Sequence, residues 1–144
     1  RNFRSRSMEG LAEIIASYLN KMPEVSEDAI GIVRQEELFN EIADVLGEAP
    51  AVIDANDVLR DPRHILGSFC AAVGLPFDPD QPIKWAPGKH EWDGAWADDW
   101  YGSVFKTTGL GPYQPPRLTI SPELQPVVDF CMPVYEHIAQ HKIT

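Results

Sequence analysis

The sequence has few cysteines and no long apolar run. Two cysteines among 144 residues are too few for a disulfide framework. Cys70 and Cys131 both lie in apolar stretches, which favours buried, reduced thiols over a disulfide between them. Reduced thiols predict a cytoplasmic location. No apolar run approaches the roughly 18 residues that cross a bilayer, so we expect no membrane-spanning segment.

Positive charge is also scarce. The chain has 12 Lys and Arg against 22 Asp and Glu, a net charge of −10. Non-specific nucleic-acid binding needs cations that neutralise phosphates, so we expect no nucleic-acid partner. Any anion site would have to be local. The composition, 44% hydrophobic and 24% charged, is that of a globular protein of one domain.

The apolar pattern predicts mostly helices. Spacings of three and four residues indicate a helix over 11–22, which Pro23 ends, and a second helix from Ser26 to Gly47. Further helices are expected at 62–74, at 95–109 and from 121 to near the end, with irregular segments between them. The basic segment 1–7 has the character of a vector-derived or disordered tail, which leaves 8–144 as the single domain.

One short stretch predicts a strand. Residues 51–53 are apolar and partly β-branched, between Pro50 and Asp54. A single strand is a poor sheet, so it needs a neighbour from another polypeptide or from a second copy. The fold class expected is therefore mainly α with one short central strand.

The other candidate sites have simpler structural interpretations. His137 and His141 have the spacing of a two-histidine metal face, but both fit the end of a helix, where an imidazole complements the dipole. Asp54 and Asp57 are paired carboxylates that more simply cap a turn. We therefore expect no catalytic group and no metal ligand among these residues.

Two stretches together carry a family resemblance. The segments "VIDANDVLRDP" at 52–62 and "KWAPGKHEWDGAWADDWYGSVFKTTG" at 84–109 occur in this order. With the flanking helices, they resemble the carboxy-terminal half of bacterial sulfotransferase-like proteins that use 3′-phosphoadenosine 5′-phosphosulfate (PAPS). The resemblance implies the carboxy-terminal portion of a P-loop-like α/β domain. The family's phosphate loop follows its first strand, and no strand, Gly-rich loop and helix with a basic residue occur in that order here.

The resemblance also implies cofactor-binding positions. The family binds the 3′-phosphate of its nucleotide with an Arg and a Ser eight residues later. Ser17 falls on the Ser position, but Glu9 occupies the Arg position, and an acid repels a phosphate. Arg4 and Arg6 are out of register and are poor substitutes.

A segment rich in tryptophan contains the remaining implied contacts. Lys89 and His90 fall on a basic pair with which the family closes over the 3′-phosphate. The alternative is that Trp92, Trp96 and Trp100 are packing residues that fasten an irregular lid to the core. Ser17, Lys89 and His90 are therefore candidates for a weak cofactor site.

These expectations define the functional hypotheses. The first is an incomplete sulfotransferase-like protein, not catalytic alone, that acts through binding or self-association. The alternatives are half of a PAPS-dependent enzyme that another polypeptide completes, with PAPS or adenosine 3′,5′-bisphosphate bound, and a purely structural interaction module. We expect a homodimer with Val52, Ile53 and the apolar face of the helix at 11–19 in its interface.

Overall fold

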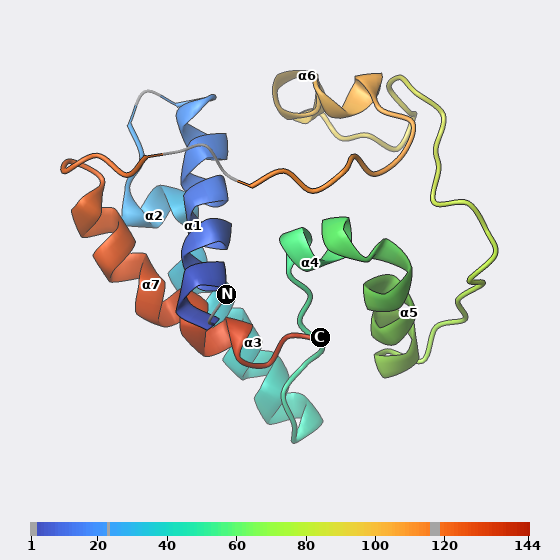
Figure 1. The fold of residues 1–144 in the computed structure, drawn as a ribbon, viewed down its shortest axis with the longest axis horizontal. Helices are drawn as coiled ribbons and strands as arrows, with labels where there is room; N and C mark the ends of the chain where they lie inside the picture. The colour runs from blue at the N-terminus through green and yellow to red at the C-terminus, as the bar shows by residue number, and fades with distance from the viewer. Residues whose placement is uncertain (1–2, 23, 116–118) are drawn as a thin grey trace. The chain divides into compact units, whose positions relative to one another are not determined.

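The computed structural model describes residues 3–22, 24–115 and 119–144 (Figure 1), and the chain divides into two compact units. The larger unit comprises residues Arg1–Phe77 and Tyr113–Thr144, and the smaller comprises Asp78–Pro112. The described part is mostly helical, as predicted. None of its helices is both long enough and apolar enough to cross a membrane.

The larger unit is built from helices. Its described elements are α1 (Phe3–Leu19), α2 (Glu27–Ile30), α3 (Ile32–Leu46), α4 (Ala55–Arg60), α5 (Pro62–Ala72) and α7 (Gln125–Ala139). Helix α7 packs against α1 and α3, and α4 contacts α5 (Figure 1). Leu11 and Ile15 of α1 and Val128 and Cys131 of α7 are almost completely buried against one another. This cluster is the core of the unit.

Local caps at Ser26 and Gly47 fix two helix ends where the sequence predicts them. The Ser26 hydroxyl accepts a hydrogen bond from the Ala29 amide at 3.2 Å, and Gly47 ends α3 with a φ of 75°. The predicted single helix from Ser26 to Gly47 is nevertheless two helices. Gly31 has a φ of 68°, which a helix interior does not accommodate, so α2 ends there and α3 begins.

Helix α1 begins earlier than predicted. It already includes Phe3, and the Ser7 side chain is buried, so residues 3–7 extend the first helix instead of forming a tail. Residues 1 and 2 lie outside the described residues. A vector origin of this segment stays a prediction.

The predicted central strand at 51–53 is wrong. Val52 forms only an isolated parallel bridge with Lys142, in which the Ile143 amide donates to the Val52 carbonyl at 2.9 Å. The neighbour is the end of the same chain, not a second copy. The dimer interface predicted on α1 is also wrong in part, because α7 of the same chain covers Leu11 and Ile15.

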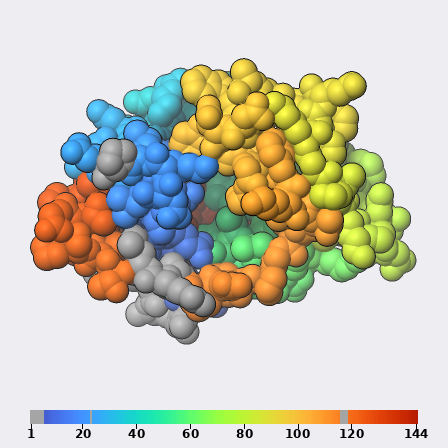
Figure 2. Space-filling view, turned by 90° about the horizontal axis from the view of Figure 1, so that it is seen from above, coloured from blue at the N-terminus to red at the C-terminus, as the bar shows by residue number. Residues whose placement is uncertain are grey.

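The smaller unit is largely irregular, as expected at its start. In place of the helix predicted over 95–109 it has one turn, α6 (Ala97–Trp100), and a 3₁₀ turn at Val104–Lys106. Ala97 is its one buried apolar residue. Its atoms, yellow to orange in Figure 2, belong to the exposed surface seen there.

The packing interpretation fails for two of the tryptophans. Trp92 and Trp96 are 81% and 75% exposed, so neither fastens the segment to a core. Trp92 instead stacks on the His90 ring, with centroids 4.8 Å apart. Trp85 behaves differently, because its indole N–H donates to the Thr107 hydroxyl at 3.0 Å.

Candidate functional site

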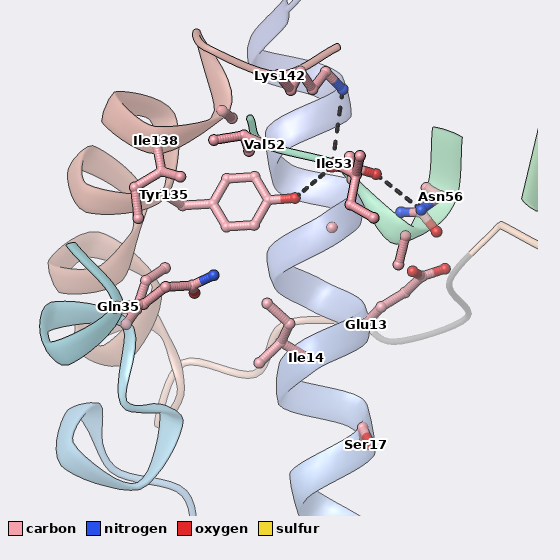
Figure 3. Close-up of a pocket in the computed structure, with 15 residues that line it drawn as sticks. Glu13, Ile14, Ser17, Gln35, Val52, Ile53, Asn56, Tyr135, Ile138 and Lys142 are labelled. Carbon is pink, nitrogen blue, oxygen red and sulfur yellow. Dashed lines mark hydrogen bonds and ion pairs between the residues drawn. The ribbon is translucent and has the colours of Figure 1, made fainter. Parts of the chain in front are cut away.

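A cavity of about 390 Å³ lies within the larger unit (Figure 3). Its walls come from α1, from α3, from the segment that leads into α4, and from α7 with the residues that follow it. Its lining residues are Gly10, Glu13, Ile14, Ser17, Ile32, Gln35, Val52, Ile53, Asp54, Ala55, Asn56, Tyr135, Ile138, Ala139 and Lys142. The volume is within the range of small-molecule sites.

Asp54 holds one wall of the cavity in place. Its Oδ1 accepts hydrogen bonds from the amides of Asn56 at 2.9 Å and Asp57 at 3.3 Å, which caps α4. Its Oδ2 accepts the Tyr135 hydroxyl proton at 2.8 Å. The capping role predicted for Asp54 is confirmed, and the same carboxylate also ties α4 to α7.

A chain of ion pairs begins at this wall with Lys142 and Asp54, both of which line the cavity. Lys142 Nζ is 2.5 Å from Asp57 Oδ2 and 3.8 Å from Asp54 Oδ2. Arg60 then joins Asp57 at 2.9 Å to Glu9 at 3.1 Å, and its guanidinium lies 3.9 Å from the centre of the Tyr113 ring. Each positive group therefore contacts two carboxylates.

Burial and pairing shift the pKa values of this network in opposite directions. Burial by itself would raise the pKa of Asp57, but the hydrogen bond and charge of Lys142, with those of Arg60, lower it overall. Burial raises the pKa of Tyr135 strongly, and the neighbouring Asp54 adds to this effect. Asp57 is thus held ionised, whereas Tyr135 is held as a hydrogen-bond donor.

Glu13 of α1 and Asn56 of α4 form a wall of the cavity in which one buried acceptor lacks a hydrogen-bond donor. Burial raises the pKa of Glu13, a hydrogen bond from Asn56 opposes this rise, and the charge of Asp54 adds to it. Asn56 is only 3% exposed, and its Oδ1 has no hydrogen-bond donor among the described residues. A buried acceptor without a donor costs free energy, so this wall favours a ligand that can donate.

The residues predicted to bind a cofactor lie in different units. Ser17 lines the cavity, whereas Lys89 and His90 belong to residues 78–112. Lys89 Nζ pairs with Asp98 at 2.7 Å, and the His90 amide donates to Asp93 at 2.7 Å. The Lys89 ammonium and the His90 amide thus already have acidic partners within their own unit.

Neither of the arginines considered for the phosphate position is among the described lining residues. Arg6 is exposed, and the side chain of Arg4 lies outside the described residues. Glu9, which occupies the expected Arg position, also accepts the Tyr113 hydroxyl proton at 2.9 Å. Glu9 therefore connects α1 to Arg60 of α4 and to Tyr113.

Several residues of the cavity were not predicted. Tyr135 and Lys142 contact Asp54 and Asp57 from 81 and 85 residues further along the chain, which no local pattern reveals. Gly10 lies just before the helix predicted over 11–22, and the apolar spacing of that helix does not indicate a close contact there. A Cβ on Gly10 would lie 2.0 Å from the Tyr135 hydroxyl oxygen, so the glycine makes room for that ring.

His137 of α7 and His141, which lies just after the end of that helix, both have structural contacts. His137 Nδ1 is 2.5 Å from Glu36, and its ring meets Phe39 edge to face. His141 also packs on Phe39, at 5.2 Å between centroids. The described residues contain no group of three or more His, Cys, Asp or Glu that could hold a metal ion.

The cavity does not fit an anionic nucleotide. Lys142 supplies the one positive charge among its described lining residues, and carboxylates surround that charge. Glu13 and Asp54 add negative charge to the walls. A phosphate there would meet repulsion without a free cation, so no binding step for PAPS is derived from this cavity.

Comparisons with known proteins identify the family. The sulfotransferase domain family matches residues 6–141. Branched-chain-amino-acid aminotransferase-like protein 2 of Arabidopsis thaliana is 33% identical over 96 residues, which are 67% of this chain and 17% of that protein. Branched-chain-amino-acid aminotransferase-like protein 1 of the same plant is 35% identical over 97 residues, which are 67% of this chain and 17% of that protein.

The chain thus spans about a sixth of the length of these curated relatives. None of the known solved structures matches it. The finer resemblance to the carboxy-terminal half of bacterial members stays a prediction. The family match covers nearly the whole sequence, and the chain belongs to the sulfotransferase domain family.

Proposed function

We propose that this chain is an incomplete sulfotransferase domain that does not transfer sulfate by itself and acts through binding. The observation that carries the proposal is the engagement of Lys142, whose ammonium is 2.5 Å from Asp57 and mostly buried. Releasing it toward a phosphosulfate would leave Asp57 buried and unpaired, which costs several kcal/mol. Arg60, held between Asp57 and Glu9, is committed in the same way.

A transfer assay tests this proposal. The purified chain is incubated with PAPS and phenol, alcohol and amine acceptors, with an active sulfotransferase as positive control. We expect no saturable sulfate transfer. Sulfate transfer by the purified chain that saturates with PAPS would overturn the proposal.

Calorimetry with adenosine 3′,5′-bisphosphate examines the predicted contacts at Ser17, Lys89 and His90. We expect no affinity better than about 10 µM, which corresponds to about −7 kcal/mol. Tighter binding that disappears in Lys89→Ala would demonstrate a retained nucleotide site and contradict the proposal.

A second candidate is a domain that other sequence completes, either in a partner polypeptide or elsewhere in a longer protein. The observation in its favour is that the matched region makes up only 17% of each relative's length. Co-expression with a sulfotransferase segment that carries a phosphate loop tests it. Appearance of PAPS-dependent transfer only in the co-expressed material would support this candidate over the first.

Self-association belongs to the first proposal. Ile53 is 40% exposed and Val45 of α3 is 86% exposed, so apolar surface remains that a second copy could cover. Sedimentation equilibrium at micromolar concentration measures this directly. A dimer supports self-association, and a monomer would remove it from the proposal.

The two relatives, which are named as branched-chain-amino-acid aminotransferase-like proteins, are much longer than this chain. An aminotransferase activity is therefore not carried over to this chain, whose family match is to the sulfotransferase domain.

A further inference from the structure

We propose that the cavity of the larger unit binds a small organic amine in its protonated form, with the ammonium beside Glu13 and Asn56 and an apolar body among the isoleucines of the lining. The inference rests on the proposed binding role and specifies its ligand class. Three features of the cavity favour such a ligand: the charge of the walls, a buried acceptor without a donor, and apolar lining residues.

Charge selects a cation. Of the charged groups in the lining, Lys142 is held by Asp57 and Asp54, and Asp54 also accepts three hydrogen bonds from protein groups. Glu13 is the lining carboxylate that no described Lys or Arg contacts within 4.0 Å. A cationic ligand would relieve the cost of keeping that carboxylate partly buried.

Hydrogen bonding selects a donor. Figure 3 shows Glu13 of α1 and Asn56 of α4 directed toward one another across this wall. The Asn56 amide already interacts with Glu13, and its Oδ1 is left without a donor. An ammonium carries three N–H donors and no acceptor, so it can serve the Glu13 carboxylate and the Asn56 oxygen together.

The remaining surface selects an apolar body. Ile14, Ile32, Val52, Ile53 and Ile138 are all part of the lining. Figure 3 places Ile138 on α7, on the side of the view away from Glu13 and Asn56. An amine whose remaining part is a hydrocarbon would bury this apolar surface.

A series of matched ligands tests the proposal. Calorimetry at neutral pH compares 2-phenylethylamine with 2-phenylethanol, 3-phenylpropanoate and phenylalanine, which share the aromatic body and differ in charge. We expect saturable binding of the amine with a dissociation constant of about 0.1–1 mM, a usual range for so small a ligand. We expect the alcohol to bind about tenfold more weakly. The anion should give no saturable heat, and the additional carboxylate should prevent binding of phenylalanine.

Two variants that each remove one negative charge test whether the ammonium of the ligand lies beside Glu13. Glu13→Gln keeps the shape of the side chain and removes the carboxylate, so amine binding should weaken about tenfold or more. Glu48→Gln makes the same change at an exposed position outside the cavity and should bind as the unmodified chain does. Equal losses in both variants would overturn the proposal, because only overall charge would then matter.

Isoleucine methyl spectra provide a readout that does not depend on a variant. Addition of 2-phenylethylamine should shift the methyl signals of Ile14, Ile53 and Ile138 and leave that of Ile83 in place. The proposal would be overturned by any of three results. These are methyl shifts confined to Ile83, equal affinity for the amine and the alcohol, and no binding of the amine at millimolar concentration. No sulfate donor is present in these experiments, so their failure is distinct from a failure of the transfer assay.

Discussion

Lys142 is a buried positive charge that contacts two buried carboxylates beside the cavity. Its side chain is 8% exposed and contacts Asp57 and Asp54, which are 12% and 10% exposed. Removing one partner of a buried pair leaves the other charge without compensation. The contribution of this one residue to stability should therefore greatly exceed that of any surface ion pair.

We expect Lys142→Met to lower the free energy of unfolding by about 3–5 kcal/mol. Arg34→Met is the control, because Arg34 is 67% exposed and pairs with Glu37 on the surface, where an ion pair contributes little to stability. Urea denaturation followed by circular dichroism measures both variants. Similar losses in the two would show that Lys142 is not the buried partner described here.

The contributions of Glu13 and Asp57 to folding stability should depend on pH in opposite directions. Because burial raises the pKa of Glu13 in the folded chain, its contribution to stability is present below its ordinary pKa and is lost as pH rises through the raised value. Asp57 has a lowered pKa, so its contribution is present above the ordinary value and is lost as pH falls through the lowered one.

We therefore expect Glu13→Gln to be more stable relative to the unmodified chain at about pH 7 than at about pH 4. The charged groups that act on Glu13 are Asp54, Arg60 and Glu9, and they are the same in both proteins. Urea midpoints at the two pH values give the comparison. A stability difference that stays constant between them would contradict the raised pKa.

Helix α1 approaches α7 closely at Gly10. A glycine within a helix usually lowers stability relative to alanine, so Gly10→Ala would ordinarily stabilise α1. Here the new Cβ would lie 2.0 Å from the Tyr135 hydroxyl oxygen and 2.8 Å from its Cζ. The ring would have to move and would weaken its hydrogen bond to Asp54.

We expect Gly10→Ala to lower the free energy of unfolding by about 1–3 kcal/mol, as overpacking does. In a Tyr135→Leu background the same substitution should be nearly neutral, because the clashing atoms are gone. Thermal unfolding of the four proteins of this double-mutant cycle provides the measurement. An equal loss in both backgrounds would place the cause outside this contact.

At the scale of elements, the sequence predicts what depends on near neighbours. Ser26, Asp54 and Gly47 act within three or four residues, and the caps and ends predicted for them are confirmed. The break at Gly31 was missed because the apolar spacing continues across it.

The contacts of Lys142 and Tyr135 were missed because they join residues more than 80 positions apart. The β-branched residues at 51–53 predict a strand, but a strand also needs a neighbouring strand with which to form hydrogen bonds. Here Val52 forms only one isolated bridge, with Lys142. The candidate cavity is built mostly from such distant contacts, so the sequence indicated Ser17 and Asp54 but not the site that they line.

At the scale of the whole molecule, the two units differ in how much they bury. The core of the larger unit consists of apolar side chains of α1, α3 and α7. The smaller unit has Ala97 as its one buried apolar residue among those described. Regions with little buried apolar surface open at a lower free energy than the core does.

The distribution of tryptophan makes this difference measurable. All four tryptophans, Trp85, Trp92, Trp96 and Trp100, lie within Asp78–Pro112, whereas the long helices belong to the other unit. We expect tryptophan fluorescence to change at lower urea concentration than far-ultraviolet circular dichroism, because the two probes report different units and a two-state transition would make them coincide.

Trp85→Phe should remove the indole hydrogen bond to Thr107 and move only the fluorescence transition. Trp92→Phe is the matched control, since that indole is 81% exposed and its loss should leave both midpoints unchanged. Coincident transitions in the unmodified chain would show instead that residues 78–112 unfold together with the core.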